Sequence, residues 1–187
     1  MIIGIFGKIG SGKTTISSKF TNFHPKFKII NADLVARKCL EQEEVKNKLK
    51  KIDENILDND NNIDRKYLRE KIFSNKEFGQ KIDDLLWPII SDEINKEISF
   101  DPTANYIIEA ALLNKLKIPN IDFKVKVKSN LFKIAYRVKK RDGVSLFNIF
   151  KIWLKQTRLL KKVKSDITIK YFYELELYIQ KNKIIVD

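Results

Sequence analysis

The sequence of 187 residues is poor in several residue types, with one cysteine, one histidine, four prolines and six glycines. The single cysteine, Cys39, excludes an internal disulfide and is typical of a protein kept in a reducing compartment. No apolar run approaches the roughly 20 residues that a membrane-spanning helix needs. The first apolar run, residues 1–6, is too short for a signal peptide. We therefore expect a cytoplasmic protein of one domain, without a membrane partner and with a sizeable apolar core.

Acidic residues are scarce relative to basic ones, since 24 Asp and Glu accompany 37 Lys and Arg and the formal net charge is +13. The excess is concentrated between positions 124 and 170, where the only acids are Asp142 and Asp166. Such a charge suits a polyanionic ligand or a nucleic acid. No helix-turn-helix, zinc or RNA-binding signature accompanies it. We expect a solvated basic face near a phosphate site and no nucleic-acid partner.

The strongest motif lies near the amino terminus, where residues 7–14 read GKIGSGKT and fit the phosphate-binding loop G-x-x-x-x-G-K-[ST]. A strand-like segment precedes it and a segment that can be helical follows it, as such a loop requires. Glycines let the chain curl so that backbone N–H groups surround a triphosphate. Lys13 would reach its β and γ phosphates, and the Thr14 hydroxyl would bind Mg²⁺. The predicted nucleotide-binding residues are Gly10, Ser11, Gly12, Lys13, Thr14 and Thr15.

Short apolar segments alternate with longer helical stretches, which predicts an α/β fold of three layers with a parallel sheet of about five strands. The strand candidates are residues 2–6, 27–31, 105–109, 123–127 and 167–169. Residues 34–100 carry apolar side chains at helical spacing and predict a helical insertion, with boundaries at Trp87-Pro88 and Asp101-Pro102. Ser129 and Ser145 can cap two further helices, over residues 131–140 and through Lys164. The core then comprises residues 1–33, 101–129 and 165–187.

Four charged side chains outside the loop are candidates for the reaction. Asp33 and Glu109 end two strand candidates, and ligands of open α/β sheets bind beyond the carboxyl ends of the strands. Asp33 could accept the proton of an attacking hydroxyl, or it could cap a helix that starts at Leu34. Glu109 could hold Mg²⁺ through a water molecule, or it could lie in the first turn of a helix. Arg137 and Arg141 share a helix face and could neutralise phosphate charge from a mobile flap or could face solvent.

Taken together, these residues make the chain resemble dephospho-CoA kinase, from its first residue to at least Asp166. The similarity rests on order and spacing along the whole chain and not on the phosphate-binding loop alone. The matching segments are residues 10–15, Ala32-Asp33, Ile63-Asp64-Arg65 with Leu68 and Phe73, Pro88, residues 108–113, Arg137 with residues 141–145, and Ser165-Asp166.

The resemblance implies transfer of the ATP γ-phosphate to the ribose 3′-hydroxyl of dephospho-CoA, the last step of coenzyme A synthesis, with ATP as donor and Mg²⁺ as cofactor. It implies that Asp33 is the general base and that Arg65 lies in an acceptor-binding insertion over residues 34–100. Arg137 and Arg141 would belong to a lid over residues 130–164. We expect Asp33, Arg65 and Glu109 to bind substrate, Lys13 to act in catalysis, and the protein to be a monomer.

Several positions depart from the family pattern. Asn31 stands where an aspartate is usual, Trp87 where a histidine precedes the proline, Lys8 where a second glycine is common, and Tyr171 where an asparagine is expected. In the late motif, Lys155 stands where a glutamine is usual, with Gln156 one residue away. Three alternatives stay open: a nucleoside or nucleotide kinase of the same fold, a nucleic-acid-associated nucleotide binder, and a degenerate member that binds without turnover.

Overall fold

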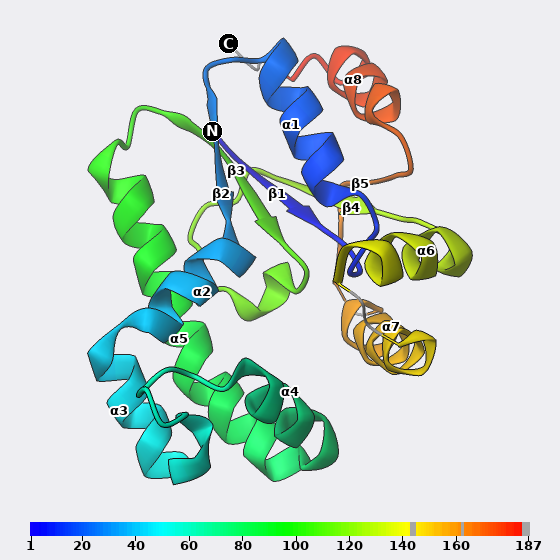
Figure 1. Ribbon diagram of the computed structural model, residues 1–187. Coiled ribbons are helices and arrows are strands. Elements are labelled where there is room, and N and C mark those ends of the chain that lie inside the picture. Colours follow the sequence, from blue (N-terminus) through cyan, green and yellow to red (C-terminus); the bar gives the residue numbers. More distant parts are fainter. Residues whose placement is uncertain (143–144, 162, 185–187) are drawn as a thin grey trace.

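The computed structural model describes residues 1–142, 145–161 and 163–184 and centres on a parallel sheet of five strands (Figure 1). The strands are β1 (Ile2–Phe6), β2 (Phe27–Asn31), β3 (Asn105–Ala110), β4 (Phe123–Val127) and β5 (Ile167–Ile169). Their order in the sheet is β2-β3-β1-β4-β5, and every neighbouring pair is parallel. The predicted strands are confirmed, with β3 longer than expected by Ala110. The carboxyl ends of β1, β2 and β3 therefore lie at one edge of the sheet.

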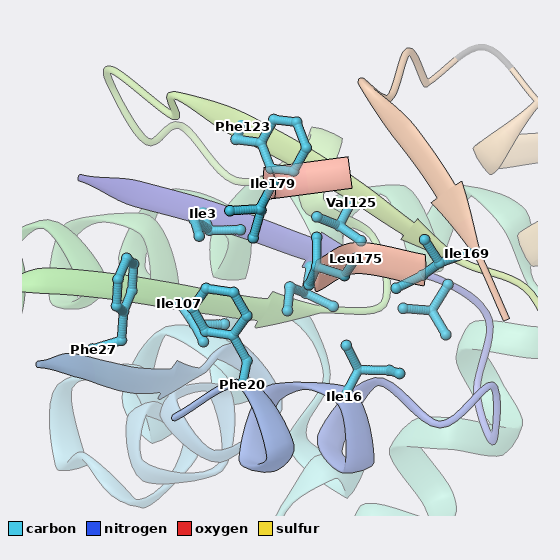
Figure 2. Packing of buried hydrophobic residues seen from close by; sticks show 12 residues of the cluster. Ile3, Ile16, Phe20, Phe27, Ile107, Phe123, Val125, Ile169, Leu175 and Ile179 are labelled. Atoms are coloured by element: carbon cyan, nitrogen blue, oxygen red, sulfur yellow. The ribbon is translucent and has the colours of Figure 1, made fainter. Parts of the chain in front are cut away.

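Helices cover both faces of this sheet and make it the middle one of three layers. On one face, α1 (Lys13–Phe23) and α8 (Phe172–Lys181) pack the fully buried Phe20 and Leu175 against Ile3 and other strand residues (Figure 2). On the other face, α2 (Ala32–Glu41) and α5 (Lys76–Phe100) bury Cys39 and Ile94. Burial of two apolar faces explains why β1 and β3 read as continuous apolar runs. The predicted fold of three α/β layers is confirmed.

Between β2 and β3 the chain forms the predicted helical insertion. After α2 come α3 (Glu43–Ile52), a 3₁₀ turn η1 (Glu54–Ile56), α4 (Arg65–Ser74) and α5. They enclose an apolar cluster of their own, made by Val45, Leu49, Ile56, Leu68, Phe78 and Ile82. This cluster gives the insertion an apolar core of its own, and the insertion projects away from the sheet (Figure 1).

The predicted boundary at Trp87-Pro88 is wrong, because α5 continues through Pro88 to Phe100. Proline has no N–H to donate to the preceding turn and usually ends or kinks a helix. Here the burial of Ile90 and Ile94 against the sheet holds the helix together across this position. The Ser91 hydroxyl donates to the Trp87 carbonyl at 2.7 Å, next to the proline.

Two helices, α6 (Leu131–Asp142) and α7 (Leu146–Leu160), form the cation-rich segment between β4 and β5. The predicted cap at Ser129 is wrong, because the Asn130 side chain accepts the Lys133 N–H at 2.8 Å. Ser145 caps α7 as predicted, since its hydroxyl accepts the Asn148 N–H. The second helix ends before the predicted Lys164, where the Val163 N–H bonds back to the Leu160 carbonyl and turns the chain toward β5.

Candidate active site

The phosphate-binding loop joins β1 to α1 at the carboxyl edge of the sheet. Gly10 (φ 69°) and Gly12 (φ 99°) have the positive φ angles that side chains other than glycine rarely adopt. The Ser11 N–H donates to the Lys8 carbonyl at 3.1 Å and tightens the loop, and α1 begins at Lys13. The amide groups at the start of a helix carry partial positive charge and bind phosphate readily. The loop therefore has the geometry that its sequence predicted.

The lid helices lie directly against this loop. Arg137 on α6 donates from Nη1 to the Gly10 carbonyl at 3.2 Å, and the Gln156 side chain on α7 accepts the Ile9 N–H at 2.8 Å. A Cβ added to Gly10 would lie only 2.8 Å from the Val138 side chain of α6. Glycine at this position thus allows both the turn of the loop and the close approach of the lid.

A cleft of about 780 Å³ opens between the loop, the lid and the start of α2. Its charged lining consists of Lys13, Asp33, Arg37, Glu109 and Arg137. Gly10, Gly12, Thr14, Thr15 and Gln156 line it as well. The structure thus brings most of the predicted site residues together around one space. Three cations and two carboxylates converge there, as suits a triphosphate and the hydroxyl that attacks it.

Across the cleft, the lid touches the helical insertion. The Lys155 ammonium of α7 lies 5.3 Å from the centre of the Phe73 ring on α4. The Phe73 ring is 45% exposed, so this cation–π contact is at the surface. The lid is therefore in contact with the insertion, of which Leu34 and Arg37 line the cleft.

Asp33 lies in the first turn of α2 and does not cap it. The cap is Asn31, whose side-chain oxygen accepts the N–H groups of Asp33 and Leu34 at 3.0 and 3.2 Å. The helix begins at Ala32, two residues earlier than a cap at Asp33 would require. Asparagine and aspartate cap helices about equally well, so the departure at Asn31 preserves this local structure. The Asp33 carboxylate is left exposed at the cleft, where it makes no hydrogen bond or ion pair with a described residue.

Glu109 lies within β3 and does not begin a helix, so that alternative is wrong. The side chain is 4% exposed, and its Oε1 accepts the Thr14 hydroxyl at 2.6 Å. Its Oε2 is buried and has no hydrogen-bond partner in the described part of the chain. A buried carboxylate oxygen without a donor is costly unless a ligand supplies one. Glu109 and Thr14 together therefore present the oxygen ligands that Mg²⁺ and its bound waters prefer.

Three predicted residues lie outside the cleft lining. Ser11 lines a neighbouring pocket beside α1 and the start of α8. Arg65 begins α4, is half exposed and donates to a Glu41 carboxylate oxygen at 3.3 Å. The Arg141 side chain falls outside the described residues, although its backbone continues α6.

Sequence reasoning missed two residues of the cleft, Arg37 and Gln156. Arg37 follows Asp33 by four residues, so both lie on one face of α2 and point to the same side. That spacing was a usable signal. Gln156 was noted only as displaced from a family position, whereas in the structure it bonds to the phosphate-binding loop.

Comparison with known proteins agrees with this geometry. The family model for dephospho-CoA kinase matches residues 1–170. A dephospho-CoA kinase of Fusobacterium nucleatum is 31% identical over 180 residues, which cover 94% of this chain and 92% of that protein. A dephospho-CoA kinase of Borreliella burgdorferi is 30% identical over 158 residues, which cover 81% of this chain and 76% of that protein. The solved structure of dephospho-CoA kinase from Campylobacter jejuni covers 100% of this chain and 97% of its own, with 23% identity and a TM-score of 0.57. The protein belongs to the dephospho-CoA kinase family.

Proposed function

We propose that the protein transfers the γ-phosphate of ATP to the ribose 3′-hydroxyl of dephospho-CoA and releases coenzyme A and ADP. The observation that carries this proposal is the convergence of Lys13 and Thr14 with Asp33 in one cleft. Family membership supports the choice of acceptor. Catalysis of phosphoryl transfer consists mainly of positioning and of stabilising negative charge, which is what this set of side chains can supply.

In this proposal, the cationic groups bind and neutralise the phosphates. The loop amides and Lys13 hold the β and γ phosphates, and Arg137 adds a guanidinium from the lid while it stays bonded to the Gly10 carbonyl. We assign Arg141 to the same lid function from its place four residues after Arg137. Closure of the lid over the loop excludes water, which protects the transferred group from hydrolysis.

Asp33 is the proposed general base. Its carboxylate is exposed to the cleft and is not engaged by a described cation, so it is free to accept the proton of the 3′-hydroxyl. Arg37, one turn further along α2, lines the same cleft and can bind a phosphate of the acceptor. Arg65, on the insertion, is proposed to bind a more distant part of this long acceptor, after exchanging its contact with Glu41.

The residues present fit Mg²⁺. Thr14 would bind the ion directly, and Glu109 would hold a water of its hydration shell through the buried oxygen that has no described partner. When bound, the ion would neutralise charge on the phosphate oxygens.

The adenine is proposed to lie in the neighbouring pocket of about 450 Å³, between α1, the start of α6 and the start of α8. Ser11, Thr15, Arg137 and Tyr171 are among its lining residues. The Tyr171 and Tyr173 rings stack there with centroids 5.7 Å apart. Tyr171 thus offers an aromatic surface in place of the asparagine that the family pattern leads one to expect.

No helix among the described residues is long and apolar enough to cross a membrane. We propose a cytoplasmic monomer whose partners are its small-molecule substrates.

The test is incubation of the purified protein with Mg-ATP and either dephospho-CoA or a panel of nucleosides and nucleotides, with products identified by mass. One added phosphate on dephospho-CoA alone is expected. Phosphate on a nucleoside or nucleotide would assign the chain to that class of kinases. Tight ATP binding without any product would contradict turnover and leave a nucleotide-binding role.

A further inference from the structure

A third pocket, of about 500 Å³, lies behind the phosphate-binding loop. Its wall is formed by Gly7 and Lys8 at the start of the loop, by the end of β4 and the residues after it, and by the end of α7. Lys13, Thr14 and the two cleft carboxylates do not line it. The pocket therefore lies apart from the proposed site of phosphoryl transfer. It adjoins the pocket proposed for the adenine, with which it shares Lys128, Ser129, Asn130 and Lys170.

Five lysines line this pocket, and no described lining residue carries a carboxylate. The lysines are Lys8, Lys126, Lys128, Lys161 and Lys170. None of them is in an ion pair within the described part of the chain, whereas other lysines pair with acids, as Lys28 does with Asp101 and Lys71 with Asp53. The positive charge of the pocket is thus left uncompensated by the residues that the structure describes.

Two of the five ammonium groups are held in place by specific contacts. The Lys8 ammonium lies 3.9 Å from the centre of the Trp153 ring on α7. The Lys126 ammonium donates to the Leu160 carbonyl at 3.1 Å, also on α7. Burial lowers the pKa of Lys8, and the positive charge of Lys126 lowers it further. Bringing these cations together costs free energy that an anion between them would recover.

We propose that this pocket is a second anion site, which binds a small molecule carrying a pyrophosphate or two phosphate groups. The number of ammonium groups calls for more than one negative charge, and phosphate oxygens accept charge-assisted hydrogen bonds from lysine. Val127 and Leu160 give the wall an apolar portion, which suits a small organic group attached to the phosphates. A nucleic-acid strand would need an extended basic groove with stacking aromatics, and this site is a compact pocket.

An occupant would contact the loop through Lys8 and the lid through Lys161. It would thereby link the phosphate-binding loop to the end of α7, next to the contact between Gln156 and the Ile9 N–H. Lys8 stands where the family commonly has glycine, so the site includes a side chain that belongs to this sequence in particular.

Inorganic pyrophosphate is the probe for the test, and Trp153 is the reporter. The chain has two tryptophans, so Trp87→Phe leaves Trp153 as the only tryptophan, whose emission is excited selectively beyond the absorption of tyrosine. Lys13→Ala weakens binding of the probe in the loop. In this background and without Mg²⁺, we expect a saturable change in Trp153 fluorescence as pyrophosphate draws Lys8 away from the ring.

Adding Lys161→Met should weaken this binding roughly tenfold, the usual effect of losing one hydrogen bond to a charged group. The matched control is Lys164→Met, which removes the same charge three positions further on, outside the pocket lining, and should leave binding unchanged. Equal binding in the two variants, or no response in their common background, would overturn the proposal. Because turnover is not measured, this result is independent of the kinase assay.

Discussion

Replacing Glu109 by glutamine is expected to make the protein more stable and less active. The carboxylate is 4% exposed, and only one of its oxygens has a described donor, the Thr14 hydroxyl. A buried charged acceptor left unsatisfied costs about 1–3 kcal/mol. Glutamine keeps the shape and removes the charge, so we expect a gain of about 1 kcal/mol, or roughly 2–4 °C in Tm for a chain of this size.

Catalysis should change in the opposite direction. If Glu109 holds a metal-bound water, replacing a charge-assisted hydrogen bond by a neutral one weakens Mg²⁺ binding by about 1–1.5 kcal/mol, the difference between the two kinds of bond. The half-saturating Mg²⁺ concentration should then rise roughly 5- to 10-fold. The assay measures initial rates over a range of Mg²⁺ at saturating ATP, beside thermal unfolding without metal. Glu77→Gln, at an exposed position on α5, is the matched control. A lower Tm with an unchanged Mg²⁺ dependence would refute the reasoning and make Glu109 a purely structural residue.

Four further predictions follow from the described contacts. Asp33→Asn should lower kcat by roughly 10²–10⁴ with little change in ATP affinity, whereas Lys13→Ala should reduce both; wild-type turnover in Asp33→Asn would remove the general base. Asn31→Ala should lower the free energy of unfolding by about 1 kcal/mol and Asn31→Asp should not, as urea titration would show; equal losses would contradict the capping role. Gln156→Ala, which frees the Ile9 N–H, should loosen the lid and raise the KM for ATP, and an unchanged KM would exclude the contact in solution. A hydrogen bond from Lys71 holds the pKa of Asp53 at about 2. The stabilising effect of this carboxylate is therefore complete above the unfolded-state pKa near 4 and is lost as the pH falls toward 2. Asp53→Asn should remove this part of the pH dependence of the free energy of unfolding, and identical pH profiles in the two proteins would disprove it.

The sheet could be predicted from the sequence because its signal is local. Strands covered on both faces need apolar runs, and those of β1 and β3 are bounded by residues that favour turns. The loop was equally predictable, since the positive φ angles of Gly10 and Gly12 are a local requirement of its backbone conformation. The Ser129 cap failed for a different reason, because Ser129 and Asn130 are both good caps and their order of preference depends on where the chain leaves β4.

Contacts between distant segments were not predictable. A proline usually ends or kinks a helix. Only the packing of α5 on the sheet explains why this helix continues through Pro88. The pairing of Gln156 with the Ile9 amide joins positions 147 residues apart, and no periodicity or spacing encodes it. For Asp33, the sequence allowed either a catalytic role or a helix cap. The structure excludes the cap, because the neighbouring Asn31 side chain fills that position.

The contact between Lys155 and Phe73 has a consequence for the sequence of binding events. A cation–π pair at an exposed site contributes about 0.5–1 kcal/mol, which is comparable to the thermal energy of about 0.6 kcal/mol at room temperature. The lid, in contrast, is fastened to the loop by two hydrogen bonds and the packing of Val138 on Gly10. In the absence of ligands, thermal motion should therefore separate the insertion from the lid more often than it separates the lid from the loop. The acceptor would then enter and leave where thermal motion separates Lys155 from Phe73. Entry of ATP would require the hydrogen bonds between the lid and the loop to break.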